Sequence, residues 1–268
     1  MKASEIFSEQ DLRGFNPEKT VEECQILPPV FEFKQHGQCG AWVSEIYPRL
    51  ATVADEITFL KGVHTDSAIH SVGEIIWHTG HQRAGFPSMG SWVLYGLGNG
   101  SDNLPGYVVL SSNGGGQDQP IASRQWHSGF LPSRYQGVHF HSTGDPVLYI
   151  SNPKGVSSRG QGEVINAVNA LNKLRNKAVA DPEIETRISQ YEMAFRMQAS
   201  VPELIDTSKE PKHIIDLYGA KPGDGSFASN CLLARRLAER GTRFIQLYPV
   251  SYTHLRAHET DSYLVCRL

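Results

Sequence analysis

Residues 226–248 read SFASNCLLARRLAERGTRFIQLY, which predicts a helix followed directly by a buried strand. Ser226 is a residue type that caps helix N-termini, and Gly241 is a residue type that ends helices. The apolar run from Arg243 to Tyr248 has the length of a strand that is covered on both faces. A helix that leads into such a strand is the repeating unit of an α/β fold with a mostly parallel sheet.

The same alternation extends upstream of this unit. Tyr107 to Leu110 is a strand candidate, and a helix is predicted from about residue 162 to 178. Asp181 and Pro182 open another helix, with an N-cap and a proline in the first turn, that continues towards Pro202. Three further helices are predicted, over 42–53, over 68–79 with Gly80 as its cap, and from about 88. Strands are predicted over 57–63 and 147–150, and a long surface loop is predicted over 111–137.

Composition argues against several classes of function. The chain has 268 residues, a formal net charge of -3 and no long basic run, which is not typical of a nucleic-acid binder. It has no apolar run of about 18 residues that would predict a membrane span, and its first residues lack the apolar segment of a signal peptide. The four cysteines form no C-x-x-C pair, so a zinc ribbon is not predicted.

The segment that carries the most chemistry runs from residue 64 to residue 81. It follows a predicted strand and opens a helix, and a helix N-terminus presents backbone N–H groups that suit an anion such as sulfate or phosphate. Thr65 supplies a hydroxyl there, and His64 and His70 supply imidazoles. We therefore predict an oxyanion or metal site at this position, with ordinary structural roles for the two histidines as the alternative.

Two other groups of histidines are open to two interpretations. His70, Glu74 and His78 are spaced four residues apart along one helical stripe, which is compatible with a metal face. We favour the alternative, a polar helix face near the surface. His139 and His141 flank Phe140 at strand spacing and face the same side, which fits a metal pair but fits a half-exposed strand face at least as well.

Several long motifs occur in order over residues 33–248: QHGQCG at 35–40, HTGHQ at 78–82, RAGFPSMGSWVLYGLG at 83–98, SGFLP at 128–132, YQGV at 135–138, GDPV at 144–147, QYEMAFRMQ at 190–198 and NCLLARRL at 230–237. Together they resemble domain-of-unknown-function family 1501, bacterial sulfatase-like proteins grouped with the alkaline phosphatases.

The resemblance implies a fold and a site. It implies an alkaline-phosphatase-like three-layer α/β/α sandwich with a divalent metal and a nucleophile at a helix N-terminus. The nucleophile position falls near His70, so the implied catalytic residues are His70 and Thr65 and the implied metal ligands are His64 and His70. The family usually has Asn-His where this chain has Ile69-His70, and no Cys or Ser stands at His70, so a formylglycine-type mechanism is not supported.

The resemblance also divides the chain. Residues 1–32 are weakly patterned, 33–248 form a partial sulfatase-like domain, and 249–268 include SYTHLRAHET, which resembles translated sequencing-adapter read-through. A genuine, divergent C-terminus is the alternative for that tail. The family's Gly-Gly-Pro-Ser segment with its Asp, and its later Asp and His runs, have no counterpart in this chain. We therefore expect a chain truncated at both ends that does not catalyse metal-dependent ester hydrolysis by itself.

The leading hypothesis is a sulfatase-like hydrolase of small sulfate or phosphate esters. By resemblance the complete protein uses a divalent metal ion, which this chain alone is not expected to bind, and is exported to the periplasm. The rival hypothesis is a non-catalytic binding or scaffold protein with the same fold. The sequence leaves the natural substrate, the metal and the oligomeric state open.

Overall fold

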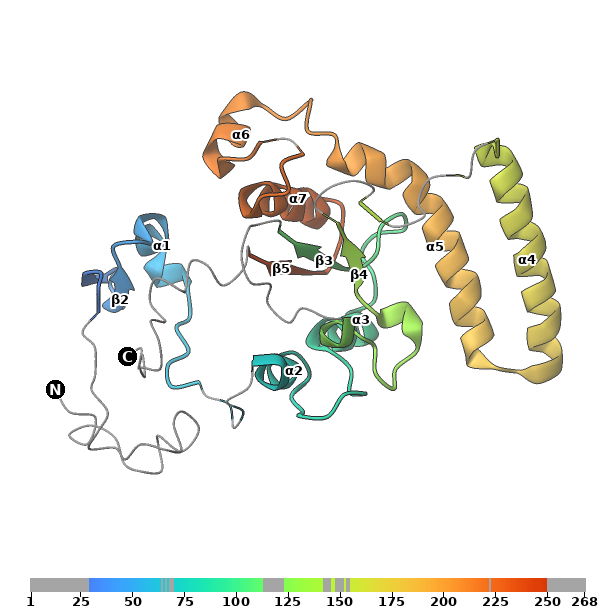
Figure 1. Cartoon of the computed structure of the whole chain (residues 1–268), viewed down its shortest axis with the longest axis horizontal. Helices are drawn as coiled ribbons and strands as arrows, with labels where there is room; N and C mark the ends of the chain where they lie inside the picture. Colours follow the sequence, from blue (N-terminus) through green and yellow to red (C-terminus); the bar gives the residue numbers. More distant parts are fainter. Residues whose placement is uncertain are drawn as a thin grey trace. The chain divides into compact units, whose positions relative to one another are not determined.

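A three-stranded parallel sheet with the strand order β4-β3-β5 forms the centre of the fold (Figure 1). Strand β3 (Tyr107–Ser111) lies between β4 (Val138–Phe140) and β5 (Phe244–Tyr248) and pairs in parallel with both. Val108 and Val109, in the middle of β3, are both 0% exposed. The predicted mixed α/β fold with a parallel sheet is confirmed.

The structure is a computed structural model that describes residues 29–63, 65, 67, 70–112, 123–141, 146–147, 152, 155–221 and 223–249. The chain divides into two compact units between residues 69 and 70. The larger unit contains the parallel sheet. Within the described part of the chain, no helix has the length and apolar character needed to cross a membrane.

One face of the sheet packs against α5 (Pro182–Ile205) and α7 (Phe227–Glu239) (Figure 1). Alternate strand residues point to this face, because side chains along a strand alternate between its two sides. They form an entirely apolar core with residues of the two helices: Leu104, Val108, Leu110, Phe140, Met197, Val201, Leu204 and Leu237.

The opposite face lies against α3 (Met89–Leu97), and α2 (His70–Thr79) reaches this side through the 3-10 helix η4 (Ser123–Gln125). Its apolar core is smaller and consists of Leu94, Tyr107, Val109 and Trp126. Helices therefore cover both faces of the sheet, and the three layers expected of an α/β/α sandwich are present in this unit. The polar residues of the strands also lie on this second face.

Local signals explain where these helices begin and end. The Ser226 side chain accepts a hydrogen bond from the backbone N–H of Ser229 at 3.1 Å and so caps α7, as predicted. Gly80, directly after α2, has a φ of +73°, which fits the predicted left-handed cap. The helix predicted from about Ser88 is α3, with Ser88 as its N-cap residue.

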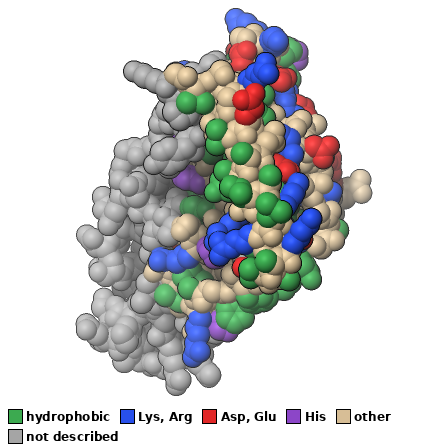
Figure 2. Space-filling view, turned by 90° about the vertical axis from the view of Figure 1, so that its right-hand side faces the viewer, with side chains coloured by type: hydrophobic (Ala, Val, Ile, Leu, Met, Phe, Trp, Pro, Cys, Tyr) green, Lys and Arg blue, Asp and Glu red, His purple; other side chains and the backbone are tan. Residues whose placement is uncertain are grey.

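Helices α4 (Ser158–Val179) and α5 form a long antiparallel pair beside the sheet (Figure 1). Both were predicted, although α5 continues through Pro202 to Ile205. The outward side of α4 carries exposed apolar residues, including Leu171 and Leu174, which are 66% and 64% exposed. Figure 2 views the molecule from this side and shows apolar side chains interspersed with lysines and arginines.

The smaller unit contains an antiparallel hairpin of β1 (Phe33–His36) and β2 (Ala41–Ser44), followed by α1 (Pro48–Thr52). The turn of the hairpin, residues 37–40, is held by Asp55, whose carboxylate accepts the backbone N–H groups of Gln38 and Cys39 at 2.9 and 2.8 Å. Gly37 has a φ of +68°, a conformation that favours glycine.

Two predictions for this unit are wrong. The helix predicted over 42–53 begins only at Pro48, because residues 41–44 pair with β1 as a strand. The strand predicted over 57–63 is absent: these residues form no strand and are largely exposed, with Leu60 78% exposed. A strand needs a pairing partner, and in the described part of this unit β1 and β2 pair only with each other.

The predicted surface loop over 111–137 is also wrong in part. Residues 113–122 lie outside the described residues, but residues 123–137 include the short helices η4 and η5 (Ser133–Tyr135). Gln125, Trp126 and Ser128 are buried, because this segment packs against the face of the sheet that carries Tyr107 and Val109. Of the strand predicted over 147–150, only Val147 is described, and it lies in a bend.

Candidate functional site

Polar side chains gather at the carboxyl ends of the parallel strands, on the face covered by α2 and α3. In open α/β sheets, ligands bind at this edge. Ser111 is the last residue of β3, and its Oγ lies 2.7 Å from Nε2 of His139 on the neighbouring strand β4. This contact, the Ser111–His139 pair, joins a hydroxyl to an imidazole at the edge of the sheet.

The environment of His139 keeps its imidazole uncharged at neutral pH. Its ring lies 5.4 Å from the ring of Trp126 and 4.6 Å from the ring of His141. Burial lowers the pKa of His139 below its usual value, and the neighbouring His141 lowers it further, because two adjacent positive charges repel each other. The imidazole of His139 is therefore available to accept a proton.

A second polar group, which we call the Tyr248 network, is centred on the last residue of β5. The Tyr248 hydroxyl donates to Oε1 of Gln125 at 2.8 Å, accepts from the Gln246 amide and lies 3.2 Å from Nε2 of His78. The Gln246 amide nitrogen also lies 3.3 Å from Nε2 of His78. Side chains from α2, η4 and β5 therefore meet at one phenol.

The Tyr248 network extends in two directions. The Gln125 amide donates to the Glu74 carboxylate on α2, and the Tyr107 hydroxyl on β3 donates to Oε1 of Gln246. Gln125 is 0% exposed, so its polar atoms depend on these partners in place of water. The network thereby ties α2 and η4 to the sheet.

Burial also sets the charge state of the Tyr248 network. It raises the pKa of Tyr248, and the nearby phenol of Tyr107 and carboxylate of Glu74 raise it further. Burial raises the pKa of Tyr107 as well, and it lowers the pKa of His78. The two phenols therefore stay protonated and His78 stays neutral at pH 7, so these side chains act as uncharged hydrogen-bonding groups.

The predicted site residues are only partly within the described structure. His70 is the first residue of α2, but its side chain is not among those described, and His64 lies outside the described residues. Thr65 belongs to the smaller unit, is exposed, and accepts a hydrogen bond from the N–H of Ser67 at 3.4 Å. The catalytic roles of His70 and Thr65 and the metal-binding roles of His64 and His70 remain predictions.

The favoured interpretation of Glu74 and His78 as residues of a surface-facing helix stripe is wrong. Both are partly buried and contact Gln125, Gln246 or Tyr248. The side of α2 that faces the sheet is polar because η4 and β5 present polar groups to it. Trp77 instead points to solvent, with 64% of its surface exposed.

Sequence reasoning did not select Ser111, Gln125, Gln246 or Tyr248. Gln246 carried a usable signal, since an amide in the middle of an apolar strand must find a buried partner. Ser111 lies 28 positions before its partner His139, and no local pattern joins the two. Gln125 lies in the segment that was interpreted as a surface loop.

The described residues do not by themselves fit a metal ion. Protein zinc sites use about three or four side-chain ligands. No group of three His, Cys, Asp or Glu residues in the described ranges is arranged to hold one. The adjacent rings of His139 and His141 supply two imidazoles, and we therefore derive no chemical step through a metal.

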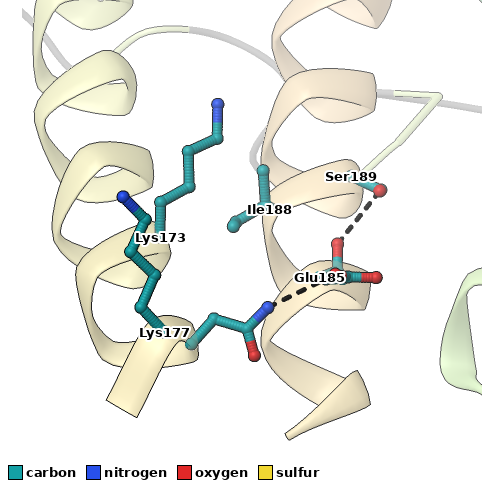
Figure 3. Close-up of a pocket in the computed structure, with 6 residues that line it drawn as sticks. Lys173, Lys177, Glu185, Ile188 and Ser189 are labelled. Carbon is teal, nitrogen blue, oxygen red and sulfur yellow. Dashed lines mark hydrogen bonds between the residues drawn. The ribbon is translucent and has the colours of Figure 1, made fainter. Parts of the chain in front are cut away.

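A groove between α4 and α5 is a weaker candidate (Figure 3). It is open, and it is lined by Lys173, Asn176, Lys177, Glu185, Ile188 and Ser189. Glu185 already accepts a hydrogen bond from the Asn176 amide at 3.3 Å, and the Ser189 hydroxyl donates to the Glu185 backbone carbonyl at 3.0 Å. Its lining contains no serine or cysteine paired with a base, in contrast to the edge of the sheet.

Comparison with known proteins gives one match. A family model described as "Protein of unknown function (DUF1501)" matches residues 5–259. This range extends beyond both ends of the stretch, 33–248, over which the motifs resemble that family. No curated protein matches the chain, and no solved structure matches it.

Proposed function

Because the chain belongs to the DUF1501 family of proteins of unknown function, we propose that it carries the sheet-edge part of a sulfatase-like hydrolase that acts on small sulfate or phosphate esters. The observation that carries this proposal is the Ser111–His139 pair at the carboxyl edge of a parallel sheet, 2.7 Å apart. A hydroxyl beside a neutral imidazole is an arrangement that nucleophilic catalysis uses.

Features around this pair are compatible with an anionic substrate. Ser112 follows directly on β3, and its Oγ accepts a hydrogen bond at 3.0 Å from the amide of Asn230 in the first turn of α7. The N-terminus of a helix carries partial positive charge, which favours a sulfate or phosphate group nearby. The resemblance to sulfatase-like proteins of the alkaline-phosphatase superfamily supports the same class of substrate.

The remaining parts of the proposal rest on the resemblance alone. They are a divalent metal ion, a catalytic role for His70, the first residue of α2, or for Thr65, metal ligation by His64 and His70, and export to the periplasm.

Turnover by the full chain tests the function. We would measure release of 4-nitrophenol from 4-nitrophenyl phosphate and of 4-nitrocatechol from its sulfate, in EDTA and with added Mg²⁺, Mn²⁺ or Zn²⁺. Release above the rate in buffer supports the hydrolase. A chain shown by circular dichroism to be folded that releases neither product and binds neither inorganic phosphate nor sulfate contradicts it.

The same assay separates the other expectations. Turnover that requires added metal and is lost in His70→Ala would contradict the expectation that this chain has no metal-dependent activity, and would support the role proposed for His70. Loss in Thr65→Ala would favour Thr65 instead. Binding of inorganic phosphate or sulfate without any turnover would favour the rival non-catalytic binding protein.

A further inference from the structure

The geometry of the Ser111–His139 pair follows from the register of two parallel strands. His139 is the Cα partner of Val109, so Ser111 lies two residues further towards the carboxyl edge. Residues two apart on a strand point to the same face, and so do paired residues on parallel neighbours. Ser111 and His139 therefore share one face, and the imidazole reaches along the strand to the hydroxyl at the edge.

Both side chains of the Ser111–His139 pair are held in place and remain partly accessible to a ligand. Each is partly buried, which holds the side chains in place while leaving surface for a ligand. Tyr248 is the Cα partner of Ser111 on the other neighbouring strand, and Trp126 packs within 5.4 Å of His139 and 6.1 Å of Tyr248, measured between rings. The pair thus lies between an aromatic wall and the Tyr248 network.

We propose that Ser111 is a nucleophile and that His139 is its general base. The inference rests on the proposed function, because it assigns catalytic residues to the same edge of the sheet. It requires the His139 tautomer that carries its proton on Nδ1, so that Ser111 Oγ–H donates to Nε2. Neither residue is among the catalytic candidates that the family resemblance implies, His70 and Thr65.

The proposed reaction with a phosphate monoester has two steps. Ser111 Oγ forms a bond to phosphorus while its proton passes to His139 Nε2, the bond from phosphorus to the ester oxygen breaks, and the leaving alcohol takes that proton. A water molecule then gives a proton to His139 and bonds to phosphorus, the bond to Ser111 Oγ breaks, and Ser111 regains its proton. Ester and water become alcohol and phosphate, and a sulfate ester follows the same course.

A fluorophosphonate probe tests the pair without needing complete turnover. The serine oxygen bonds to the probe's phosphorus and fluoride leaves, so mass spectrometry of peptides locates the labelled residue. We expect the label on Ser111 in the full chain and its loss in Ser111→Ala. His139→Gln should slow labelling by about 100-fold or more, the lower range of a general base. Ser200→Ala is the matched control, because the Ser200 hydroxyl on α5 donates to the Arg196 backbone carbonyl at 3.2 Å, and this variant should label at the parent rate.

A second variant covers the case that Ser111→Ala disturbs folding. Ser111→Cys keeps a nucleophile of similar size, and iodoacetamide should alkylate it faster in this single variant than in the double variant Ser111→Cys/His139→Gln, which lacks the imidazole. The parent labelling rate should rise with pH as His139 loses its proton, below pH 6.5, with His141 as the neighbouring titrating group. In His139→Gln that rise should disappear.

The inference is overturned if the probe leaves Ser111 unlabelled, or if labelling is the same with and without His139. It also fails, with the hydrolase intact, if Ser111→Ala still turns over the phosphate or sulfate ester. Labelling of Ser111 that depends on His139, in a chain that neither hydrolyses these esters nor binds phosphate or sulfate, would support the activated serine and contradict the proposed class of substrate.

Discussion

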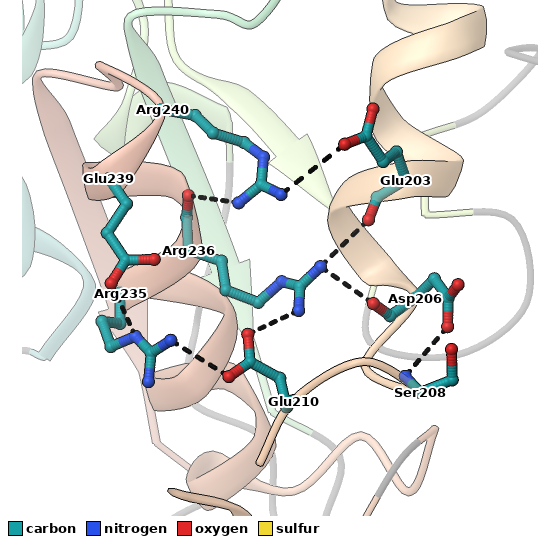
Figure 4. Close-up of polar contacts among 8 residues, drawn as sticks. All are labelled: Glu203, Asp206, Ser208, Glu210, Arg235, Arg236, Glu239 and Arg240. Atoms are coloured by element: carbon teal, nitrogen blue, oxygen red, sulfur yellow. Dashed lines mark hydrogen bonds and ion pairs between the residues drawn. The ribbon is translucent and has the colours of Figure 1, made fainter.

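Nη1 of Arg236 lies 2.6 Å from Oε1 of Glu210, and both side chains are almost fully buried, at 7% and 10% exposed. Figure 4 shows that Arg236 on α7 also donates from Nη2 to the backbone carbonyls of Glu203 and Asp206, at 3.0 and 2.8 Å. These carbonyls lie at the C-terminal end of α5, where backbone acceptors lack helical partners. A single guanidinium thus joins α7 to the end of α5 and to the segment that follows it.

Arg236→Ala should therefore destabilise the larger unit strongly. The change removes the donor from two backbone carbonyls and leaves Glu210 paired with Arg235 alone, at 3.1 Å, which costs about 2–4 kcal/mol. Urea unfolding followed by circular dichroism measures the change. Arg159→Ala removes an exposed pair with Glu163, whose side chains are 90% and 68% exposed, and should change the free energy of unfolding by less than about 0.5 kcal/mol. Equal effects of the two variants would contradict the role given to Arg236.

The turn of the β1–β2 hairpin should depend on the charge of Asp55. The backbone N–H groups of Cys39 and Gln38 donate to its carboxylate and hold its pKa below the usual value of 3.8. A folded-state pKa below the unfolded one means that the stabilisation is present above pH 3.8 and is lost as the pH falls through the folded-state pKa. NMR titration should show the Gln38 and Cys39 amide shifts following the Asp55 carboxyl. Asp55→Asn should remove that titration, and its persistence in the variant would contradict the assignment.

In the larger unit, stability should depend on pH through the imidazole of His78 in place of a carboxyl group. Burial lowers the folded-state pKa of His78 below 6.5, so the unfolded chain binds a proton more readily. Stability should therefore rise with pH between the folded-state pKa and 6.5 and then level off. His78→Gln should flatten part of this rise in thermal unfolding measured from pH 5 to pH 7.5. His139 contributes with the same sign, so a smaller slope would remain.

The elements predicted well from sequence are those whose signals are local. Helix α7 has a capping serine at its start and a glycine after its end, and the strand that follows it is a short apolar run. The β1–β2 hairpin has no capping signal and no apolar run of this kind. Its register depends on pairing between residues up to 11 positions apart, such as Phe33 and Ser44. The apolar spacing of residues 42–53 was compatible with a helix, and strand pairing decided otherwise.

The sequence predicted a site at residues 64–81, after a strand over 57–63 that is absent, and so it did not locate the Ser111–His139 pair. Parallel strands imply a ligand site at their carboxyl edge, and that inference needs only the alternation of helices and strands. The residues at this edge come from segments far apart in the chain: 28 positions separate Ser111 from His139, and 170 separate His78 from Tyr248. Composition and spacing do not contain such pairings, so Glu74 and His78 were interpreted as surface residues.

Tyr248→Phe should show whether the Tyr248 network stabilises the fold. The change removes one hydroxyl that contacts Gln125, His78 and Gln246, and it leaves buried amide groups without that partner. Leaving a buried polar group unsatisfied costs about 1–3 kcal/mol. Tyr95→Phe, at a side chain that is 56% exposed on α3, is the matched control and should cost less than about 0.5 kcal/mol. A loss in the control as large as in Tyr248→Phe would refute a specific role for the network.

Two glycines of α3 should respond in opposite ways to the same substitution. A Cβ at Gly90 would lie 2.5 Å from the Tyr107 ring and 2.7 Å from the Phe244 ring, whereas a Cβ at Gly96 would meet no heavy atom within 4 Å apart from its chain neighbours and the backbone of its own helix. The absence of a side chain at Gly90 lets α3 approach the sheet where these two rings meet edge to face, with centroids 5.1 Å apart.

Gly90→Ala should therefore cost about 1–3 kcal/mol, because both rings must move from their packed positions. Gly96→Ala should stabilise the chain by about 0.5–1 kcal/mol, since alanine loses less backbone entropy than glycine in a helix and meets no steric conflict there. Urea unfolding of the two variants under identical conditions measures both changes. Stabilisation by Gly90→Ala would mean that α3 does not lie closely against Tyr107 and Phe244, and the second layer of the sandwich would then have to pack against the sheet in a different way.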